Sequence, residues 1–253
     1  MRNSDTARLR ELMKGYTVQD PGNTPSDQQE KRPMPPMAVV RGGQRFDLSR
    51  NWPAGTELAC ALESRRSRRK FDKQPLTLDQ LAFLLWAAQG VEKTLPGRTV
   101  RTVPSAGSRH PLELYAFVNC VEGLESGLYH YLALEHQLEL IGRDRAQGDK
   151  LSRALLDQPF AGHAPVCLVW TAVPYRTEWR YDSKAQKYIL LDAGHSCQNV
   201  YLACESLGLG CCAIAAYEQE KLDALLGLPP GPSADEGAEF AVYACCVGRP
   251  EQP

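Results

Sequence analysis

The sequence of 253 residues contains no long apolar run and no excess of charge of either sign. No apolar stretch approaches the length of about 20 residues that spans a bilayer, so we expect no membrane partner. Lysine and arginine total 29 against 30 aspartates and glutamates, a balance that argues against a general binder of nucleic acids. Residues 1–16 lack the apolar core of a secretory signal, which favours a cytoplasmic protein.

The nine cysteines show no metal-binding spacing, because the sequence contains no CxxC pair. Their number is odd, which argues against a framework of disulfides in a reducing compartment. Cys211-Cys212 and Cys245-Cys246 fall in apolar, strand-like runs, where adjacent side chains point to opposite faces. We therefore expect buried structural thiols and no metal site.

The chain divides into a polar N-terminal part and a globular remainder. Residues 17–37 are rich in Pro, Asp, Gln and Ser and carry few core-forming side chains, a composition typical of a tail or linker. From about residue 54 the apolar pattern is that of a folded domain, without a second linker or an internal repeat. We predict an N-terminal extension or linker, partly flexible, over residues 1–53 and one domain over residues 54–253.

Helix and strand patterns follow one another without a regular alternation. Thr56 is placed to cap a short helix over 57–64, and Thr77 with Gln80 forms a capping-box pattern before an apolar helical stripe. A long helix is expected over 184–207. Strands are expected over 112–120, 164–173, 211–217 and 239–248, with a hairpin over 127–142. This order predicts an α+β domain whose sheet is covered by helices.

The stretch LESRRSRRKF, residues 62–71, places four arginines and a lysine around one serine. Arginine binds phosphate through two parallel hydrogen bonds, so the run suits one compact anion, such as a mononucleotide phosphate, better than a polymer backbone. Taken alone, a solvated basic turn explains the run equally well.

Four segments together resemble the FMN-dependent nitroreductase family, in the form of its SagB/ThcOx-like branch, which includes the azoline dehydrogenases. They appear in the order of the family, at residues 65–71, 104–115, 192–228 and 241–250. The resemblance covers roughly residues 54–250. It implies a nitroreductase-like fold, with a central, mainly antiparallel or mixed sheet flanked by helices, and FMN bound at a homodimer interface.

The resemblance also implies which residues bind FMN. The ribityl and phosphate groups would be held by Arg65, Ser67, Arg69 and Arg249, while Arg66 either contributes or lies at the surface. The isoalloxazine would be lined, from the neighbouring subunit, by Pro104, Ser105, Ala106, Gly107 and Arg109. The segment of Ile214, Ala215 and Ala216 would pack near the ring, with Gln158 as a looser match. Well-studied bacterial members have an acidic residue and a glycine at the last two positions of that segment, so their nicotinamide contacts are not expected to be copied.

Lys187 and Tyr188 resemble, in position, a Lys-Tyr pair that the azoline dehydrogenases share and that is implicated in their catalysis. A neutral lysine could take a proton while hydride leaves the substrate, and the tyrosine could orient it. The alternative is a first-turn surface lysine and a tyrosine that packs in the core. On the same helix, His195 is expected to be a hydrogen-bonded core histidine. Residues 175–181 are expected to form a lid-like helix or loop beside the flavin, or a plain amphipathic helix.

Together these observations predict a homodimeric FMN-dependent oxidoreductase. It would pass hydride from NAD(P)H to a nitroaromatic, a quinone or a similar small molecule. No Rossmann fingerprint is present, so a nicotinamide donor is expected to stack on the flavin instead of occupying its own domain. One alternative is a dehydrogenase that oxidises an azoline-type or other C–N substrate. Another is a flavin-, metal- or thiol-binding protein without turnover.

Overall fold

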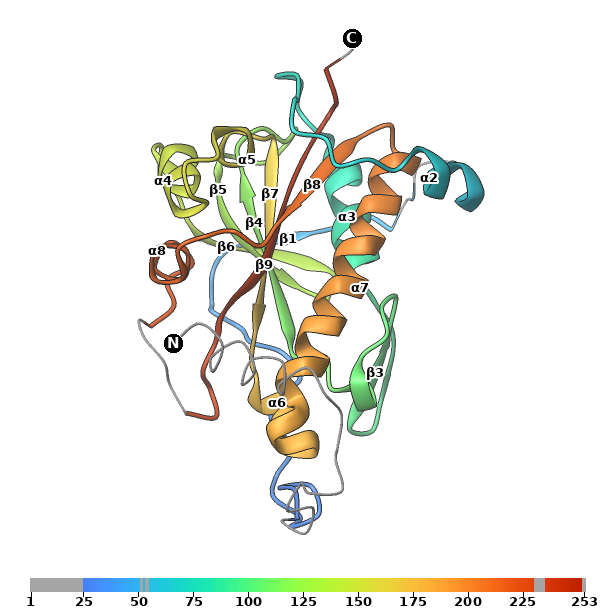
Figure 1. Cartoon of the computed structure of the whole chain (residues 1–253), viewed down its shortest axis with the longest axis vertical. Helices are drawn as coiled ribbons and strands as arrows, with labels where there is room; N and C mark the ends of the chain where they lie inside the picture. Colours follow the sequence, from blue (N-terminus) through green and yellow to red (C-terminus); the bar gives the residue numbers. More distant parts are fainter. Residues whose placement is uncertain (1–24, 51, 53–54, 230–234, 252–253) are drawn as a thin grey trace, which may run out of the picture.

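An antiparallel sheet of seven strands runs through the protein, in the order β1-β6-β5-β4-β7-β9-β8. The computed structural model describes residues 25–50, 52, 55–229 and 235–251 (Figure 1). The strands are β1 (Arg45–Asp47), β4 (Leu112–Val118), β5 (Gly127–Leu132), β6 (Gln137–Gly142), β7 (Val166–Ala172), β8 (Gly210–Ile214) and β9 (Phe240–Gly248). A separate two-stranded sheet pairs β2 (Val91–Leu95) with β3 (Arg98–Arg101). The predicted antiparallel sheet is confirmed.

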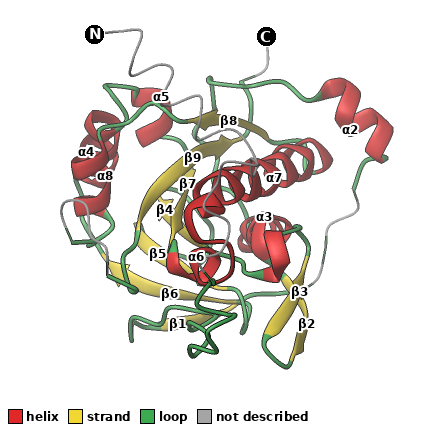
Figure 2. Ribbon diagram, turned by 60° about the horizontal axis from the view of Figure 1, so that its bottom comes forward, coloured by secondary structure: helices red, strands yellow, loops and turns green. Residues whose placement is uncertain are grey.

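Helices cover both faces of the main sheet (Figure 2). One face packs against α3 (Leu78–Gln89) and α7 (Ala185–Ser206), and the other against α4 (Gln147–Ala154), α5 (Pro159–Gly162) and α8 (Gln219–Leu225). The remaining helical elements are α2 (Leu58–Ser64), α6 (Tyr175–Tyr181) and the 3-10 turns η1 (Ala106–Ser108) and η2 (Asp182–Lys184). The α+β class is confirmed. In Figure 1, α2 lies beside one end of α7 and α6 beside the other.

The cysteines divide between these two faces as the strand pattern predicts. The face toward α7 holds Cys197, Cys204, Cys211 and Cys245. The opposite face holds Cys167, Cys212 and Cys246, which stand directly opposite one another on three neighbouring strands. All seven are buried, whereas Cys60 is exposed and Cys120 half-buried, and all nine are free thiols. Burial raises the pKa of the Cys167 thiol to about 12. These thiols therefore pack the core as neutral groups.

Two predicted helix starts have different outcomes. Thr77 caps α3 as predicted: its Oγ1 accepts a hydrogen bond from Gln80 N at 3.2 Å, and Gln80 Oε1 accepts one from Thr77 N at 3.0 Å. Thr56 does not cap α2, so that prediction is wrong. The N-cap position belongs to Glu57, whose side chain makes no capping bond. The short α2 instead depends on its position against α7.

The described part of the N-terminal extension packs against the domain. Strand β1 precedes the boundary predicted between residues 53 and 54, yet it pairs with β6 as an edge strand of the main sheet. Ahead of it, Tyr175 Oη donates to Asp27 Oδ2 at 2.8 Å, and Trp179 Nε1 donates to Arg32 O at 3.1 Å. Residues 25–43 therefore run across α6 toward the sheet.

Candidate active site

The arginine segment, residues 65–71, lies along the free edge of β8. Ser67 forms a parallel bridge with Cys211, and Arg68 N donates to Cys211 O at 2.9 Å. Beyond it, Asp72 N donates to Arg249 O at 2.9 Å. Backbone pairing thus brings Arg249, at the end of β9, beside the arginine segment, although the two are far apart in the sequence.

Tyr201 of α7 holds the arginine segment from the other side. Its hydroxyl accepts a hydrogen bond from Ala213 N at 2.9 Å and lies 2.9 Å from Ser67 Oγ. The guanidinium carbon of Arg65 lies 5.2 Å from the centre of the Tyr201 ring, a cation–π contact. Burial raises the pKa of Tyr201, so its hydroxyl stays protonated. Sequence reasoning missed this residue, which links the segment, β8 and α7.

The four arginines predicted to bind FMN have different surroundings. Arg65 is half-buried, whereas Arg66, Arg69 and Arg249 are exposed. Arg66 Nη1 donates to the carbonyl oxygens of Glu63 and Arg65, at 2.9 and 2.8 Å. It therefore satisfies carbonyl groups at the C-terminal end of α2. Arg69 lies beside the Cys212 thiol, and Arg249 Nε lies 4.0 Å from Asp72 Oδ2. The cluster is cationic and open to solvent, as a phosphate site requires.

Gln158 lies against the segment that follows β8. Its Nε2 donates to Leu155 O at 2.7 Å and to Ala216 O at 3.4 Å. Ile214 is buried, while Ala215 and Ala216 are exposed. The structure therefore brings Gln158 and the 214–216 segment together at the same sheet edge as the arginine segment.

The second predicted flavin segment forms a tight turn, residues 104–110, at the other end of α7. Gly107 has φ of 57°, and a Cβ atom there would lie 2.7 Å from Tyr181 Oη and 3.0 Å from Arg180 Cδ. Glycine is required both by this backbone conformation and by the close approach of α6. The 175–181 segment is thus a helix that covers the turn, and its role as a lid beside a flavin stays a prediction.

Hydrogen bonds from several elements fix the conformation of the 104–110 turn. Ser105 Oγ accepts from His110 N at 2.9 Å, and Asp192 Oδ1 of α7 accepts from Ala106 N at 3.4 Å. Arg109 donates to Gly107 O at 3.1 Å and to Gly97 O at 3.0 Å, and its guanidinium stacks on the Trp179 ring. Pro104 is exposed at the start of the turn.

The Lys187–Tyr188 pair lies close to this turn. The Tyr188 ring packs edge-on against Tyr181, with ring centres 4.9 Å apart, and Tyr181 in turn reaches Gly107. Lys187 is half-buried in the first turn of α7. His195, predicted to be a core histidine, is exposed on the outer face of α7. That prediction is wrong, because the buried stripe of the helix passes through Asp192 and Ser196 instead.

The predicted site residues form two separate clusters in the chain. Tyr188 and Tyr201 mark the two clusters on α7, and they lie 13 residues apart, which is about 20 Å along a helix. One cluster, here named the sheet-edge half-site, consists of the arginine segment, Arg249, Gln158 and residues 214–216. The other, named the turn half-site, consists of the 104–110 turn with Lys187 and Tyr188. The names anticipate the function proposed below.

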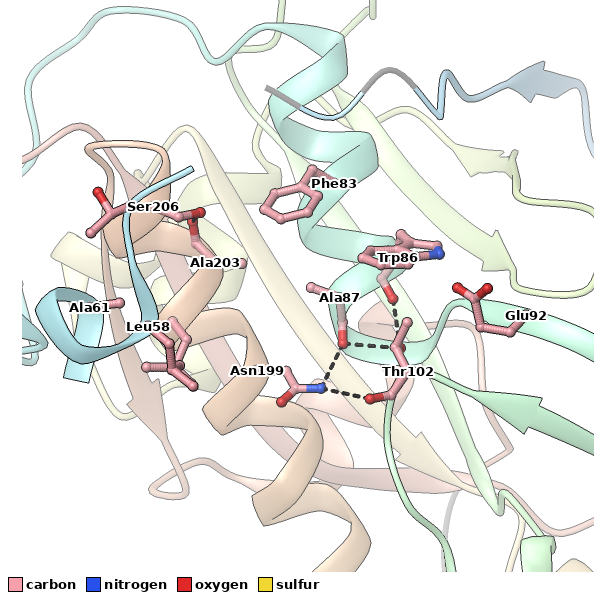
Figure 3. Close-up of a pocket in the computed structure, with 12 residues that line it drawn as sticks. Leu58, Ala61, Phe83, Trp86, Ala87, Glu92, Thr102, Asn199, Ala203 and Ser206 are labelled. Atoms are coloured by element: carbon pink, nitrogen blue, oxygen red, sulfur yellow. Dashed lines mark hydrogen bonds between the residues drawn. The ribbon is translucent and has the colours of Figure 1, made fainter. Parts of the chain in front are cut away.

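An apolar pocket of about 500 Å³ opens beside α7, between α2 and α3 (Figure 3). Asn199 does not offer its amide to this pocket, because Nδ2 donates to Ala87 O at 3.0 Å and to Thr102 O at 3.2 Å. None of the predicted flavin residues lines the pocket, whose walls include Leu58, Phe83, Trp86 and Leu202. Leu58, Leu190 and Leu191 are at least half exposed. Leu58 belongs to the wall of the pocket, whereas Leu190 and Leu191 are exposed nearer the start of α7.

Two observations concern metals and membranes. In the part of the chain that the structure describes, no three or more His, Cys, Asp or Glu side chains are grouped so as to hold a metal ion. Within the same residues, no helix has the length and apolar character needed to cross a membrane.

Comparison with known proteins identifies the fold. The family model described as "Nitroreductase family" matches residues 62–249, which is most of the chain. The chain belongs to the nitroreductase family. A crystal structure of a family member from Ralstonia eutropha JMP134 superposes with a TM-score of 0.68 at 29% sequence identity. It covers 85% of this chain and 94% of the other.

Two relatives of this nitroreductase-family chain differ in what their names state. A protein of Methanocaldococcus jannaschii named "putative nitroreductase" is 38% identical over 176 residues, which is 70% of this chain and 87% of that protein. The trifolitoxin-processing protein TfxB of Rhizobium leguminosarum bv. trifolii is 29% identical over 164 residues, or 61% of this chain. The chain spans only 44% of TfxB. The second similarity agrees with the predicted SagB-like branch.

Proposed function

We propose that this chain is an FMN-dependent oxidoreductase that works as a homodimer and passes hydride from NAD(P)H to a nitroaromatic, a quinone or a similar small acceptor. The observation that carries the proposal is the pair of half-sites at opposite ends of α7. Each half-site is locally complete, with its side chains held by hydrogen bonds and ring contacts. Neither half-site alone offers both a phosphate cluster and a flat, small-residue surface.

A two-fold dimer through the exposed apolar side chains of α7 would supply the missing half. Leu190 and Leu191 are exposed on α7, and a symmetric interface buries the same patch on both subunits. With two copies of α7 antiparallel, the arginine segment of one subunit approaches the 104–110 turn of the other. Two equivalent sites result, each built from both chains.

The residues present suit FMN. Arg65, Arg69 and Arg249 offer guanidinium groups to a phosphate at an open sheet edge, and Ser67 Oγ lies beside them for a ribityl hydroxyl. Pro104 is exposed and Ala106 has a small side chain, so a flat ring could approach the turn on the side that α6 does not cover. When bound, FMN would supply two-electron hydride chemistry. The chain itself supplies position, charge and exclusion of water, and the exposed Ala215 and Ala216 leave space beside the ring for a stacked nicotinamide or acceptor.

The proposal is tested by anaerobic titration of the purified protein. FMN uptake should reach one equivalent per subunit, and size-exclusion chromatography with light scattering should give a dimer. NADH or NADPH should then bleach the flavin, and a nitroaromatic or quinone should restore its colour. A colourless protein that takes up no FMN would overturn the proposal.

The packing of Tyr188 against Tyr181, close to the turn, favours a second candidate function. Tyr188 packs against Tyr181, which lies against Gly107 of the turn, and Lys187 precedes Tyr188 in the first turn of α7. This arrangement supports a role for the lysine as a base and for the tyrosine hydroxyl beside a substrate at the flavin. We therefore also propose oxidation of an azoline-type or other C–N substrate, with FMN as the hydride acceptor. The similarity to a toxin-processing protein supports this direction.

Lys187→Ala separates the two candidates. If the chain is a C–N dehydrogenase, the variant should lose substrate oxidation but keep reduction of its flavin by NAD(P)H. Lys93→Ala, at an exposed position in β2, is the matched control and should change neither. Unchanged substrate oxidation by Lys187→Ala would remove the case for a catalytic lysine.

A further inference from the structure

Two buried aspartates accept backbone hydrogen bonds, but only one of them is fully satisfied. Asp223 and Asp192 are each 6% exposed. Asp223 Oδ1 accepts from Ala241 N at 2.8 Å, and its Oδ2 accepts from Gln219 Nε2 at 2.9 Å. Asp192 Oδ1 accepts from Ala106 N at 3.4 Å, whereas Asp192 Oδ2 is buried and has no hydrogen-bond partner among the described residues.

The neighbours of Asp192 supply one hydrogen bond, and it goes to Oδ1. Its donor is Ala106 N, and the bond is long and therefore weak. Ser105, which precedes Ala106 in the 104–110 turn, lies close to the same carboxylate. Burial raises the pKa of Asp192, while Ser105, the Ala106 amide and the nearby His195 oppose that rise. A buried acceptor left empty normally costs stability.

We propose that Asp192 is a flavin-binding residue: Oδ1 holds the 104–107 segment, and Oδ2 accepts a hydrogen bond from an N–H or O–H group of the flavin that this segment faces. The inference rests on the proposed FMN function and names a contact that the sequence motif did not indicate. It explains why a costly buried carboxylate on α7 lies next to the turn. It also explains why its second oxygen lacks the partner that Asp223 has.

The test compares Asp192→Asn with Asp192→Ala and with Asp223→Asn. In Asp192→Asn the amide oxygen still accepts from the turn, but an NH2 group replaces the free acceptor. The melting temperature of the FMN-free protein should therefore stay near that of the wild type. The FMN dissociation constant, measured by fluorescence titration, should rise about tenfold to a hundredfold, the range for a lost hydrogen bond to a charged group. Asp192→Ala should lose both stability and affinity.

Asp223→Asn is the matched control. It should lower the melting temperature, because both carboxylate oxygens are in use, and leave the FMN dissociation constant unchanged. A second readout is the flavin midpoint potential, which should rise in Asp192→Asn because a negative charge near the ring has been removed. A purely structural aspartate would not shift that potential.

Ser105→Ala keeps the test informative if Asp192→Asn folds poorly. It removes the hydroxyl that accepts from His110 N within the turn but keeps the Asp192 carboxylate, so it should weaken FMN binding less than Asp192→Asn does. Equal losses of FMN affinity in Ser105→Ala and Asp192→Asn would assign the effect to the conformation of the turn and overturn the role of Oδ2. Wild-type affinity in Asp192→Asn would also overturn it while leaving the proposed function standing. A wild-type protein that binds no FMN would overturn both.

Discussion

The two ends of α7 support their half-sites by different physical means. At the Tyr201 end, the arginine segment pairs through its backbone with β8, and neutral tyrosine and thiol groups fill the space beneath. At the Asp192 end, the 104–110 turn is held by α6 and by buried charges. We expect the sheet-edge half-site to be rigid and the turn half-site to depend on a few charged contacts.

Arg176 is the centre of the charged end. Its Nη2 lies 2.5 Å from Glu113 Oε1, its Nε donates to Pro36 O at 2.9 Å, and its Nη1 donates to His110 O at 3.3 Å. One guanidinium thus joins α6 to the N-terminal segment, to β4 and to the 104–110 turn. Glu113 also accepts from His130 Nε2 at 2.9 Å and from Val39 N at 3.2 Å. The N-terminal segment therefore contributes to the support of the turn.

The largest expected effect comes from Arg176→Ala. The change leaves Glu113 buried without its guanidinium partner, and breaking a buried ion pair typically costs about 3–5 kcal/mol. The free energy of unfolding, measured by urea titration, should fall by that amount. Arg143→Ala breaks an exposed ion pair with Glu125 at 2.8 Å and should cost less than about 1 kcal/mol. Similar losses of unfolding free energy in both variants would contradict the view that buried charges stabilise the Asp192 end of α7.

Lowering the pH should reduce the stability that the buried charges give to the Asp192 end of α7. Burial alone would raise the pKa of Glu113, but the Arg176 guanidinium and the hydrogen bond from His130 lower it from 4.5 to about 2. Glu113 therefore binds fewer protons in the folded state, and its contribution is complete above pH 4.5 and lost as the pH falls toward 2. That contribution is about 3 kcal/mol.

The pH dependence is measured by urea unfolding at a series of pH values, with Glu113→Gln beside the wild type. The wild type should lose stability between pH 4.5 and 2, and the variant should lose less over that range because the titrating group is gone. Glu125→Gln, at an exposed position, should keep the wild-type slope. Identical slopes for wild type and Glu113→Gln would exclude this carboxyl as the source.

Arg65 and Arg68, at the sheet-edge end, should differ in their effect on FMN binding. Arg65 stacks on Tyr201, whereas Arg68 is exposed and its Cβ and Cγ lie against Gly210. Arg65→Ala should raise the FMN dissociation constant about tenfold to a hundredfold, as expected for a charged hydrogen bond to phosphate. Arg68→Ala should change it much less. Equal losses in a flavin titration would mean that the arginines act as a diffuse patch.

Local patterns in the sequence predicted most of the sheet-edge half-site. The strands, the long helix and the Thr77 capping box follow from apolar periodicity and from contacts within a few residues. Alternation along β8 and β9 correctly placed neighbouring cysteines on opposite faces. The resemblance to the family then indicated which residues bind FMN, and backbone pairing brings one of them, Ser67, beside β8.

The contacts that hold the 104–110 turn were much harder to predict from the sequence. The bonds from Arg176 to Pro36 and from Val39 to Glu113 join residues more than 70 positions apart, and no periodicity encodes such pairs. The three-residue β1 is too short for an alternation signal. The β2–β3 hairpin was missed, although Pro96-Gly97 is a common turn dipeptide and Gly97 has φ of 70°. Asp192 and Tyr201 were detectable only as polar groups on a mainly apolar helix face.

The smallest expected effect comes from Tyr201→Phe at the sheet-edge end. The change removes the hydroxyl that joins Ser67 to Ala213 N, and the amide loses its acceptor at a cost of about 1–2 kcal/mol in unfolding free energy. The phenyl ring keeps the contact with Arg65, so FMN affinity should fall less than in Arg65→Ala. Tyr129→Phe, which removes a hydroxyl bonded to Glu125 O at 2.8 Å, should reduce stability slightly and leave FMN affinity unchanged. A loss of affinity in Tyr201→Phe as large as that in Arg65→Ala would show that the hydroxyl, and not backbone pairing with β8, positions the arginine segment.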